Sequence, residues 1–320
     1  MHVRNILKKL NATNRTHAAF VANRLLGGVP IRLSAVRTRG SQEAGCRSRG
    51  VEFAPDSPLE GGGFELSVPG DGQSRSGDAN FGLSQTDVAY AAFHGEGPFA
   101  AAGPDPKLRT LIALYREAFT VVAGADTGIR NFQDLRGKRV GVGTSGVGYN
   151  FTYDVVLGFY GSATSGPERV LEFSPAEQNQ ALCGNKVDAI IFEAGHPNGL
   201  TQEATTDCRA RLVRVTGPPI DRLLATHSDY VAYVIPGGMY PGNPDGIPTI
   251  GTQAVLVTSS NQPDELCYAV VKAVIENFAD FRRLHPVLST LEIKDMVPSG
   301  SVIPIHPGAL NYYREAGLSH

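Results

Sequence analysis

Residues 139–160, RVGVGTSGVGYNFTYDVVLGFY, contain the pattern that decides the fold. Arg139–Val142 is typical of a buried strand, the next residues of a Gly/Ser/Thr loop, and the segment from about Val147 to Tyr160 of a helix. A loop that leads into a helix leaves backbone N–H groups free at the positive end of the helix dipole. The loop is therefore a candidate anion site, although an ordinary strand-to-helix turn is the alternative. It lacks the Lys of a Walker loop and the register of a dinucleotide fingerprint, so a small carboxylate fits it better than a pyrophosphate.

Strands and helices alternate on both sides of this segment. Strands are predicted at 108–115, 119–124, 139–142, 170–173, 186–192 and 252–259. The clearest amphipathic helix lies at 263–286, where Leu266, Val270, Val274 and Phe278 recur at near-helical spacing. This alternation predicts an α/β protein with mostly parallel sheets.

The length of 320 residues is enough for two domains of ordinary size. The net charge of −2 gives no reason to expect a nucleic-acid partner, but the charge is unevenly distributed. Residues 1–50 hold ten basic residues and one acidic residue, which gives +9 and leaves −11 on the rest. The Gly-, Ser- and Pro-rich composition of 51–78 favours disorder.

Several classes of protein are not supported by the sequence. No run of about 18 apolar residues predicts a membrane-spanning helix, and no apolar run of about 7–15 residues follows the basic start, so we expect no secretory signal here. We also expect no cofactor and no metal, because the four cysteines lack the spacing of a zinc site. The cysteines are compatible with reduced thiols or with a bridge between Cys183 and Cys208.

Two further segments contain candidate functional residues. In GLSQTDVAY, residues 82–90, a strand ends in Gln85, Thr86 and Asp87 at the sheet edge where α/β proteins usually bind ligands. The alternative there is a helix cap, Thr86 or Asp87, with nothing bound. His196 follows a buried strand in the sequence GHP and is compatible with a ligand donor, a catalytic base or a packed structural residue. No nucleophile or catalytic partner accompanies it, so we expect no enzyme.

The order of seven segments resembles the TAXI-type solute-binding proteins of TRAP (tripartite ATP-independent periplasmic) transporters. They are SGDANFGLSQTDVAY (76–90), GEGPFA (95–100), LRTLIALYREAFTVVAGADTGIRNFQDLRGKRVGVGTSGVG (108–148), GHPNGLTQEATTDC (195–208), IPGGMYPGNPDGIPTIGTQAVLVTS (235–259), ENFADFRRLHP (276–286) and IHPGALNYYREAGL (305–318). The resemblance covers about three quarters of the chain, and residues 17–78 are atypical of the family.

The resemblance implies a two-lobed periplasmic-binding-protein fold of type II, with residues 1–125 and 251–320 in lobe one and 126–250 in lobe two. It implies a monomeric periplasmic receptor that binds a small organic acid between the lobes, such as glutamate, glutamine or a dicarboxylate like 2-oxoglutarate. The loaded receptor would deliver this acid to a TRAP permease in the membrane. A non-binding, degenerate copy and an enzyme acting on a small acid remain the alternatives.

The resemblance also implies roles for single residues. The ligand-binding candidates are Gln85, Asp87, Tyr90, Thr144, Ser145, Gly146, Val147, Gly148 and His196. The pair Cys183 and Cys208 corresponds to a disulfide of many family members, which favours a bridge over free thiols.

Overall fold

The computed structural model describes residues 81–143, 148–161 and 166–318. The basic N-terminal segment, the atypical stretch 17–78 and the loop residues 144–147 lie outside the described residues, so what the sequence predicts for them stays a prediction. Within the described ranges, no helix is both long and apolar enough to cross a membrane.

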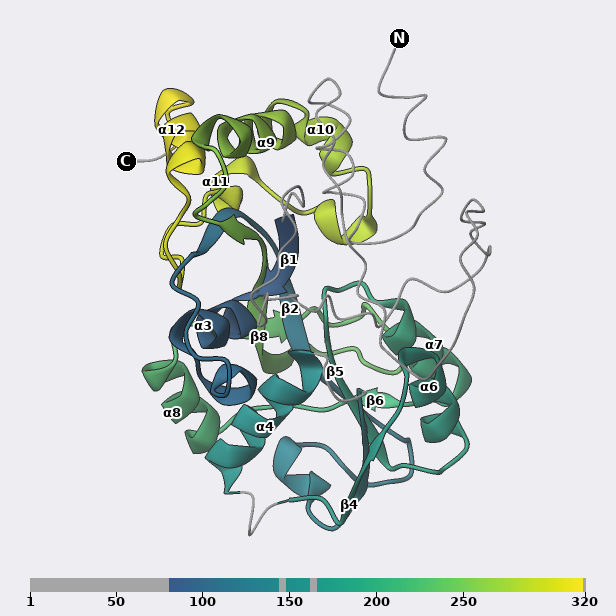
Figure 1. Cartoon of the computed structure of the whole chain (residues 1–320). Coiled ribbons are helices and arrows are strands. Elements are labelled where there is room, and N and C mark those ends of the chain that lie inside the picture. Colours follow the sequence, from purple (N-terminus) through teal and green to yellow (C-terminus); the bar gives the residue numbers. More distant parts are fainter. Residues whose placement is uncertain (1–80, 144–147, 162–165, 319–320) are drawn as a thin grey trace, which may run out of the picture.

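A mixed sheet with flanking helices forms the centre of the molecule and confirms the α/β class (Figure 1). The strand order is β1-β8-β2-β5-β3-β4, with β6 paired to β2 and β7 paired to β8. The strands in the described part are β1 (Phe81–Gln85), β2 (Leu108–Ala123), β3 (Arg139–Val142), β4 (Arg169–Glu172), β5 (Ala189–Ala194), β6 (Arg211–Leu212), β7 (Val231–Ile235) and β8 (Ile247–Ser259).

Strands β2 and β8 are long, at 16 and 13 residues, and they pair with each other along most of their length. The sequence predicts two strands where β2 is continuous, so that prediction is wrong. The polar pair Arg116 and Glu117 does not break the strand, because these residues stay in the ladder opposite Gln253 and Thr252. A register irregularity just before Arg116 changes the direction of the side chains, which leaves Arg116 exposed and Glu117 buried.

The expectation of mostly parallel sheets is also wrong. Among the described strands, β3 runs parallel to β4 and β5, and the other pairings are antiparallel. The reason is the course of the two long strands. β1 and β5 end near the middle of β2 and β8, whereas β2 and β8 continue through this region. β8 starts its pairing with β1 at the level where β1 ends, so these two strands run in opposite directions. In the same way β2 starts its pairing with β5 at the level where β5 ends, so this pair is also antiparallel.

Apolar clusters divide the molecule into two halves. On β2, residues up to Leu114 pack with β1 and the C-terminal helices, and residues from Ala118 pack with β3 and β5. On β8 the corresponding change lies between Ile250 and Ala254. We call the two parts the β1 half and the β5 half. The lobe division predicted from the sequence stays a prediction.

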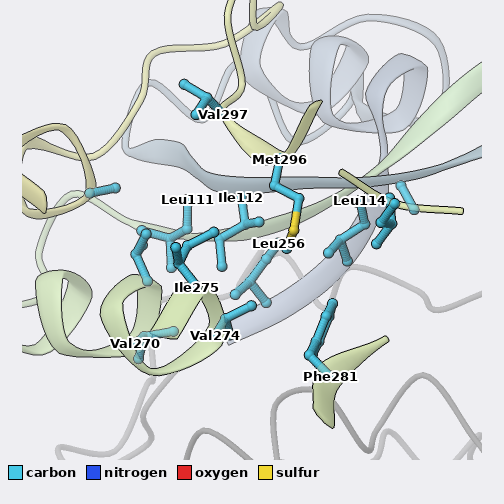
Figure 2. Packing of buried hydrophobic residues seen from close by; sticks show 14 of the residues in the cluster. Leu111, Ile112, Leu114, Leu256, Val270, Val274, Ile275, Phe281, Met296 and Val297 are labelled. Atoms are coloured by element: carbon cyan, nitrogen blue, oxygen red, sulfur yellow. The ribbon is translucent and has the colours of Figure 1, made fainter. Parts of the chain in front are cut away.

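Helices of the β1 half cover the outer parts of β2 and β8. They are α3 (Thr86–His94), η1 (Gly97–Phe99), α9 (Asp264–Glu276), α10 (Phe278–Phe281), η3 (Pro286–Leu288), α11 (Ile293–Met296) and α12 (Pro307–Glu315). The amphipathic helix predicted at 263–286 is α9, which ends earlier, at Glu276, and is followed by α10. Val270 and Val274 pack against Leu111, Ile112 and Leu256 of the sheet (Figure 2).

The β5 half contains η2 (Phe132–Leu135), α4 (Gly148–Tyr160), α6 (Pro175–Cys183), α7 (Gly199–Asp207) and α8 (Pro218–Thr226). The pattern quoted at the outset is therefore β3 followed by α4, with the intervening residues 144–147 not described. Cys183 and Cys208 form a disulfide between the C-terminal ends of α6 and α7, as the resemblance implies. This bridge joins two neighbouring helices within one half and does not connect the two halves.

Candidate functional site

Polar side chains from different elements meet where β2 and β8 pass from one half to the other. The members of this boundary cluster are all buried: Gln85 on β1, Asp87 on α3, Glu117 on β2, Thr152 on α4, Glu193 on β5, Tyr230 before β7 and Thr252 on β8. Three of them are carboxyl groups. Because burying a carboxylate costs free energy unless it is hydrogen-bonded, the partners of these groups decide what the cluster can do.

The direct connection from β1 to α3 positions the first members of the cluster. Gln85 ends β1 and is the N-cap residue of α3, but its side chain does not cap the helix. The expectation that Thr86 or Asp87 caps this helix is wrong. The Thr86 hydroxyl donates to the carbonyl oxygen of Asp229 and accepts from the N–H of Gln253 instead. It therefore fastens the start of α3 to β8 and to the segment before β7.

Gln85 links two of the carboxyl groups. Its Nε2 lies 2.8 Å from Glu117 Oε2 and 2.9 Å from Glu193 Oε2, so each of its two amide protons has an acceptor. Since Glu193 belongs to the β5 half and Gln85 to the β1 half, one of these hydrogen bonds crosses the boundary.

Thr152 lies between the third carboxyl group, Asp87, and Glu193. Its Oγ1 is 2.5 Å from Asp87 Oδ2 and 2.8 Å from Glu193 Oε2. The Tyr230 hydroxyl donates to Asp87 Oδ2 at 3.1 Å, and the Thr252 hydroxyl donates to Glu193 Oε1 at 3.3 Å. Asp87 comes from the β1 half, and both Thr152 and Tyr230 come from the β5 half. The two halves are therefore joined by hydrogen bonds as well as by the two strands.

Burial changes the acidity of these groups. Removal from water raises the pKa of Asp87 to about 6, and the nearby negative charge of Asp229 acts in the same direction. Burial raises the pKa of Glu193 well above its usual value, with further contributions from the charges of Asp87 and Glu117. Burial also raises the pKa of Tyr230, which therefore remains a hydrogen-bond donor at neutral pH.

The other candidates from the sequence have different surroundings. Tyr90 lies on α3, half-buried, with its ring centroid 4.3 Å from that of the exposed His94. Gly148 is the first residue of α4. The remaining loop candidates, Thr144–Val147, lie outside the described residues. In the described part of the chain, no group of three or more His, Cys, Asp or Glu residues has the arrangement of a metal site.

His196 has hydrogen-bond partners at both ring nitrogens. Nε2 lies 3.0 Å from Thr120 Oγ1, and Nδ1 lies 2.5 Å from the hydroxyl of Tyr240. The Thr120 hydroxyl donates to the carbonyl oxygen of Ala118, so it accepts from a proton on Nε2. Nδ1 then accepts from Tyr240, whose hydroxyl oxygen accepts in turn from the N–H of Asn198. The sequence left three interpretations of His196: a ligand donor, a catalytic base or a packed structural residue. These contacts favour the packed structural residue.

Sequence reasoning missed Glu117, Thr152, Glu193, Tyr230 and Thr252. A signal for two of them is present in the sequence. Glu117 separates two strongly apolar runs, and Glu193 follows the run AIIF at 189–192. A single carboxylate inside a run that otherwise predicts a buried strand indicates a buried charge that needs partners. The two threonines and the tyrosine give no comparable signal, because these residue types are common at both buried and exposed positions.

Comparisons with known proteins give one family and several remote structures. The sequence profile of the NMT1-like family matches residues 73–317. Similar solved structures include an arginine transport-system periplasmic binding protein from Legionella pneumophila, at 16% identity and TM-score 0.34 over 56% of this chain and 64% of that one. A structure from the study of glutathione import through GshT in Streptococcus mutans has 15% identity and TM-score 0.39, over 59% and 67%. XAC2383 from Xanthomonas citri, bound to chloride, has 9% identity and TM-score 0.39, over 75% and 76%. The chain thus spans just under two thirds of the Legionella protein.

The contacts of His196 lead to a first prediction. His196→Phe keeps an aromatic ring of similar size but removes both hydrogen bonds and leaves the buried Thr120 and Tyr240 hydroxyls without this partner. We expect the free energy of unfolding at pH 7, measured by urea denaturation, to fall by about 1–3 kcal/mol. The matched control is His94→Phe at the exposed end of α3, which should change it by less than about 0.5 kcal/mol.

The acidity of the ring gives an independent readout. Burial lowers the pKa of His196 to about 4, whereas an unfolded histidine titrates near pH 6.5. The unfolded chain therefore binds more protons between these values, and the stabilisation from His196 should decrease as the pH falls from about 6.5 to 4. Equal costs for the two variants, or an NMR titration of His196 near pH 6.5, would contradict the assignment.

Proposed function

This chain belongs to the NMT1-like family, and we propose that it is a periplasmic solute-binding receptor that closes around a small ligand between its two halves. The observation that carries the proposal is the pair of long strands. β2 and β8 are shared by both apolar cores, and they change from one core to the other at facing positions. Because the two strands cross from one half to the other side by side, the halves can rotate against each other about this crossing without unfolding either core.

The contacts across the boundary support such a motion. Asp87 bonds to Thr152 and Tyr230, and Gln85 bonds to Glu193, so side chains rather than a continuous core hold the halves together here. We propose that these contacts form on closure and separate on opening. We keep as a proposal the two-part division 1–125 with 251–320 and 126–250, but we place its first crossing on β2 between Leu114 and Ala118, because residues from Ala118 onward pack in the β5 half.

We propose a small organic acid as the ligand, specifically glutamate, glutamine or a dicarboxylate such as 2-oxoglutarate. The residues Thr144–Gly148, which lead into α4 and include its first residue, would bind a carboxylate through their N–H groups, and Tyr90 would form a wall of the cleft. Gln85 and Asp87 would contribute the polar edge of the β1 half. His196 would act by positioning the loop that follows β5, because both of its ring nitrogens already have partners.

Ligand binding can be tested by thermal unfolding in the presence of glutamate, glutamine and 2-oxoglutarate, with glucose as the control solute. A ligand at one hundred times its Kd stabilises the folded state by about 2.7 kcal/mol. For a protein of this size we expect a rise in Tm of roughly 4 °C. The absence of any concentration-dependent rise would favour the degenerate copy, and turnover of one of these acids would favour the enzyme.

Closure of the halves can be tested at Gly195. A Cβ at this position, in the loop after β5, would overlap Val287 of η3 and lie 2.9 Å from Cδ2 of Tyr115, both in the β1 half. Gly195→Ala should therefore strain the closed arrangement by about 1–2 kcal/mol, which raises the ligand Kd about 5- to 30-fold by calorimetry.

The matched control is Gly158→Ala on the exposed side of α4, where a Cβ meets no other atom within 4 Å. This variant should leave the Kd unchanged, because neither half has to move to accommodate the methyl group. An unchanged Kd for Gly195→Ala, with binding otherwise intact, would show that ligand binding does not need this contact between the halves.

We further propose, from the resemblance of the sequence, that the membrane partner is a TRAP permease. Cells that produce the receptor together with its permease should lose uptake of the labelled acid when an ionophore collapses the ion gradient. Uptake should continue when ATP is depleted and the gradient is maintained. The opposite pattern would indicate an ATP-driven importer and would contradict the TRAP assignment.

A further inference from the structure

Thr152 makes two close contacts to carboxyl oxygens, but its hydroxyl has a hydrogen for only one of them. Its hydroxyl has a single hydrogen, yet Oγ1 lies within hydrogen-bond distance of two carboxyl oxygens, Asp87 Oδ2 and Glu193 Oε2. If both carboxyl groups were ionised, one of these two contacts would bring two acceptor oxygens together without a hydrogen between them. Both contacts become hydrogen bonds when one carboxyl group is protonated and donates to Thr152, which then donates to the other.

The surroundings of the pair favour the extra proton. Glu193 faces Asp87 of the β1 half and Glu117 of the β2 segment between the halves. Asp87 faces Asp229 and Tyr230 of the β5 half, and Asp229 in turn lies near Glu96 and His227. Gln85, Thr152 and Thr252 are the neutral partners. Among the hydrogen bonds and ion pairs of the described residues, none brings a Lys, Arg or His side chain to Asp87 or Glu193. Charge repulsion within the cluster is therefore relieved by protonation.

We propose that closure of the two halves takes up one proton, which Asp87 and Glu193 share through Thr152. This inference rests on the proposed function, because it requires that the halves separate. Asp87 lies in the β1 half, whereas Thr152 and Glu193 lie in the β5 half, so opening breaks the chain of hydrogen bonds at Asp87. In the open receptor both carboxyl groups meet water and ionise at neutral pH. The proton belongs to the pair rather than to either residue alone.

The direction of the acidity changes agrees with this geometry. Burial raises the pKa of both Asp87 and Glu193, so the closed state binds protons more strongly than the open state. By linkage, a ligand that favours closure raises proton affinity, and a rise in pH weakens ligand binding. While one proton is taken up per binding event, Kd increases about tenfold for each pH unit.

Calorimetry measures the proton directly. Titration of the full chain with glutamate, glutamine or 2-oxoglutarate at pH 7, in phosphate, HEPES and Tris buffers, gives an apparent heat that depends on the ionisation enthalpy of the buffer. The slope of the apparent heat plotted against the buffer ionisation enthalpy is the number of protons exchanged on binding. We expect an uptake of about one proton. Glu193→Gln removes the shared proton and should give a slope near zero and a Kd that no longer depends on pH. Glu265→Gln, an exposed carboxyl on α9, should behave as wild type.

The outcomes separate this inference from the proposed function. Binding with a slope near zero in the wild type overturns the shared proton and leaves the receptor function standing. If no acid binds, the receptor function for these ligands fails. The shared proton is then tested by measuring the Tm of the wild type and of Glu193→Gln between pH 5 and 8. A shared proton requires the wild type to lose stability relative to Glu193→Gln as the pH rises, because the folded pair has the raised pKa. Parallel Tm curves would then overturn it.

Discussion

Two continuous strands must serve two apolar cores, and the rest of the structure depends on this constraint. An apolar side chain on β2 or β8 is useful where it faces one core or the other. Between Tyr115 and Ala118, and between Ile250 and Ala254, the strands belong to neither core. Polar residues can be buried at these positions without interrupting a core, provided that side chains from neighbouring elements satisfy them. Glu117 and Thr252 face each other in the ladder at this level.

The boundary cluster follows from the same arrangement. β1 and β5 end beside the changeover, so Gln85 and Glu193 are delivered to it by the ends of two strands, and α3 begins there with Asp87. A buried carboxyl group is costly, and the number of available donors decides its ionisation. Gln85 supplies two protons, and Thr152, Tyr230 and Thr252 supply one each. These donor groups are all uncharged. They can therefore satisfy the carboxyl oxygens as acceptors, but they cannot balance the negative charge of several ionised carboxylates.

The sequence predicted the parts of the fold that local pattern controls. β3 has the predicted bounds, α4 begins within one residue of its predicted start, and Gln85 and Asp87 were identified because a strand visibly ends in polar residues. The errors have a common cause. The break expected at Arg116 and Glu117, and the parallel direction expected for the sheet, both depend on which strand lies beside which. Pairing between β2 and β8 joins residues more than one hundred positions apart in sequence, and single-sequence patterns do not contain that information.

Two titrating groups with opposite requirements lie close to the boundary. Nδ1 of His196 accepts the hydrogen bond from Tyr240 only while the imidazole ring is neutral, and burial lowers the pKa of the ring to about 4. The stabilisation that it provides is therefore lost as the medium becomes acidic. Asp87 and Glu193 have raised pKa values, so their contribution is lost as the medium becomes alkaline. On the proposed closure, the contact between the halves is thus strongest at intermediate pH, where the histidine is neutral and the carboxyl pair retains a proton. Asp87 and Glu193, which are linked across the boundary, set the upper pH limit. His196, which lies in the β5 half alone, sets the lower pH limit. Raising the pH should consequently open the halves, whereas lowering it should first loosen the loop that contains His196.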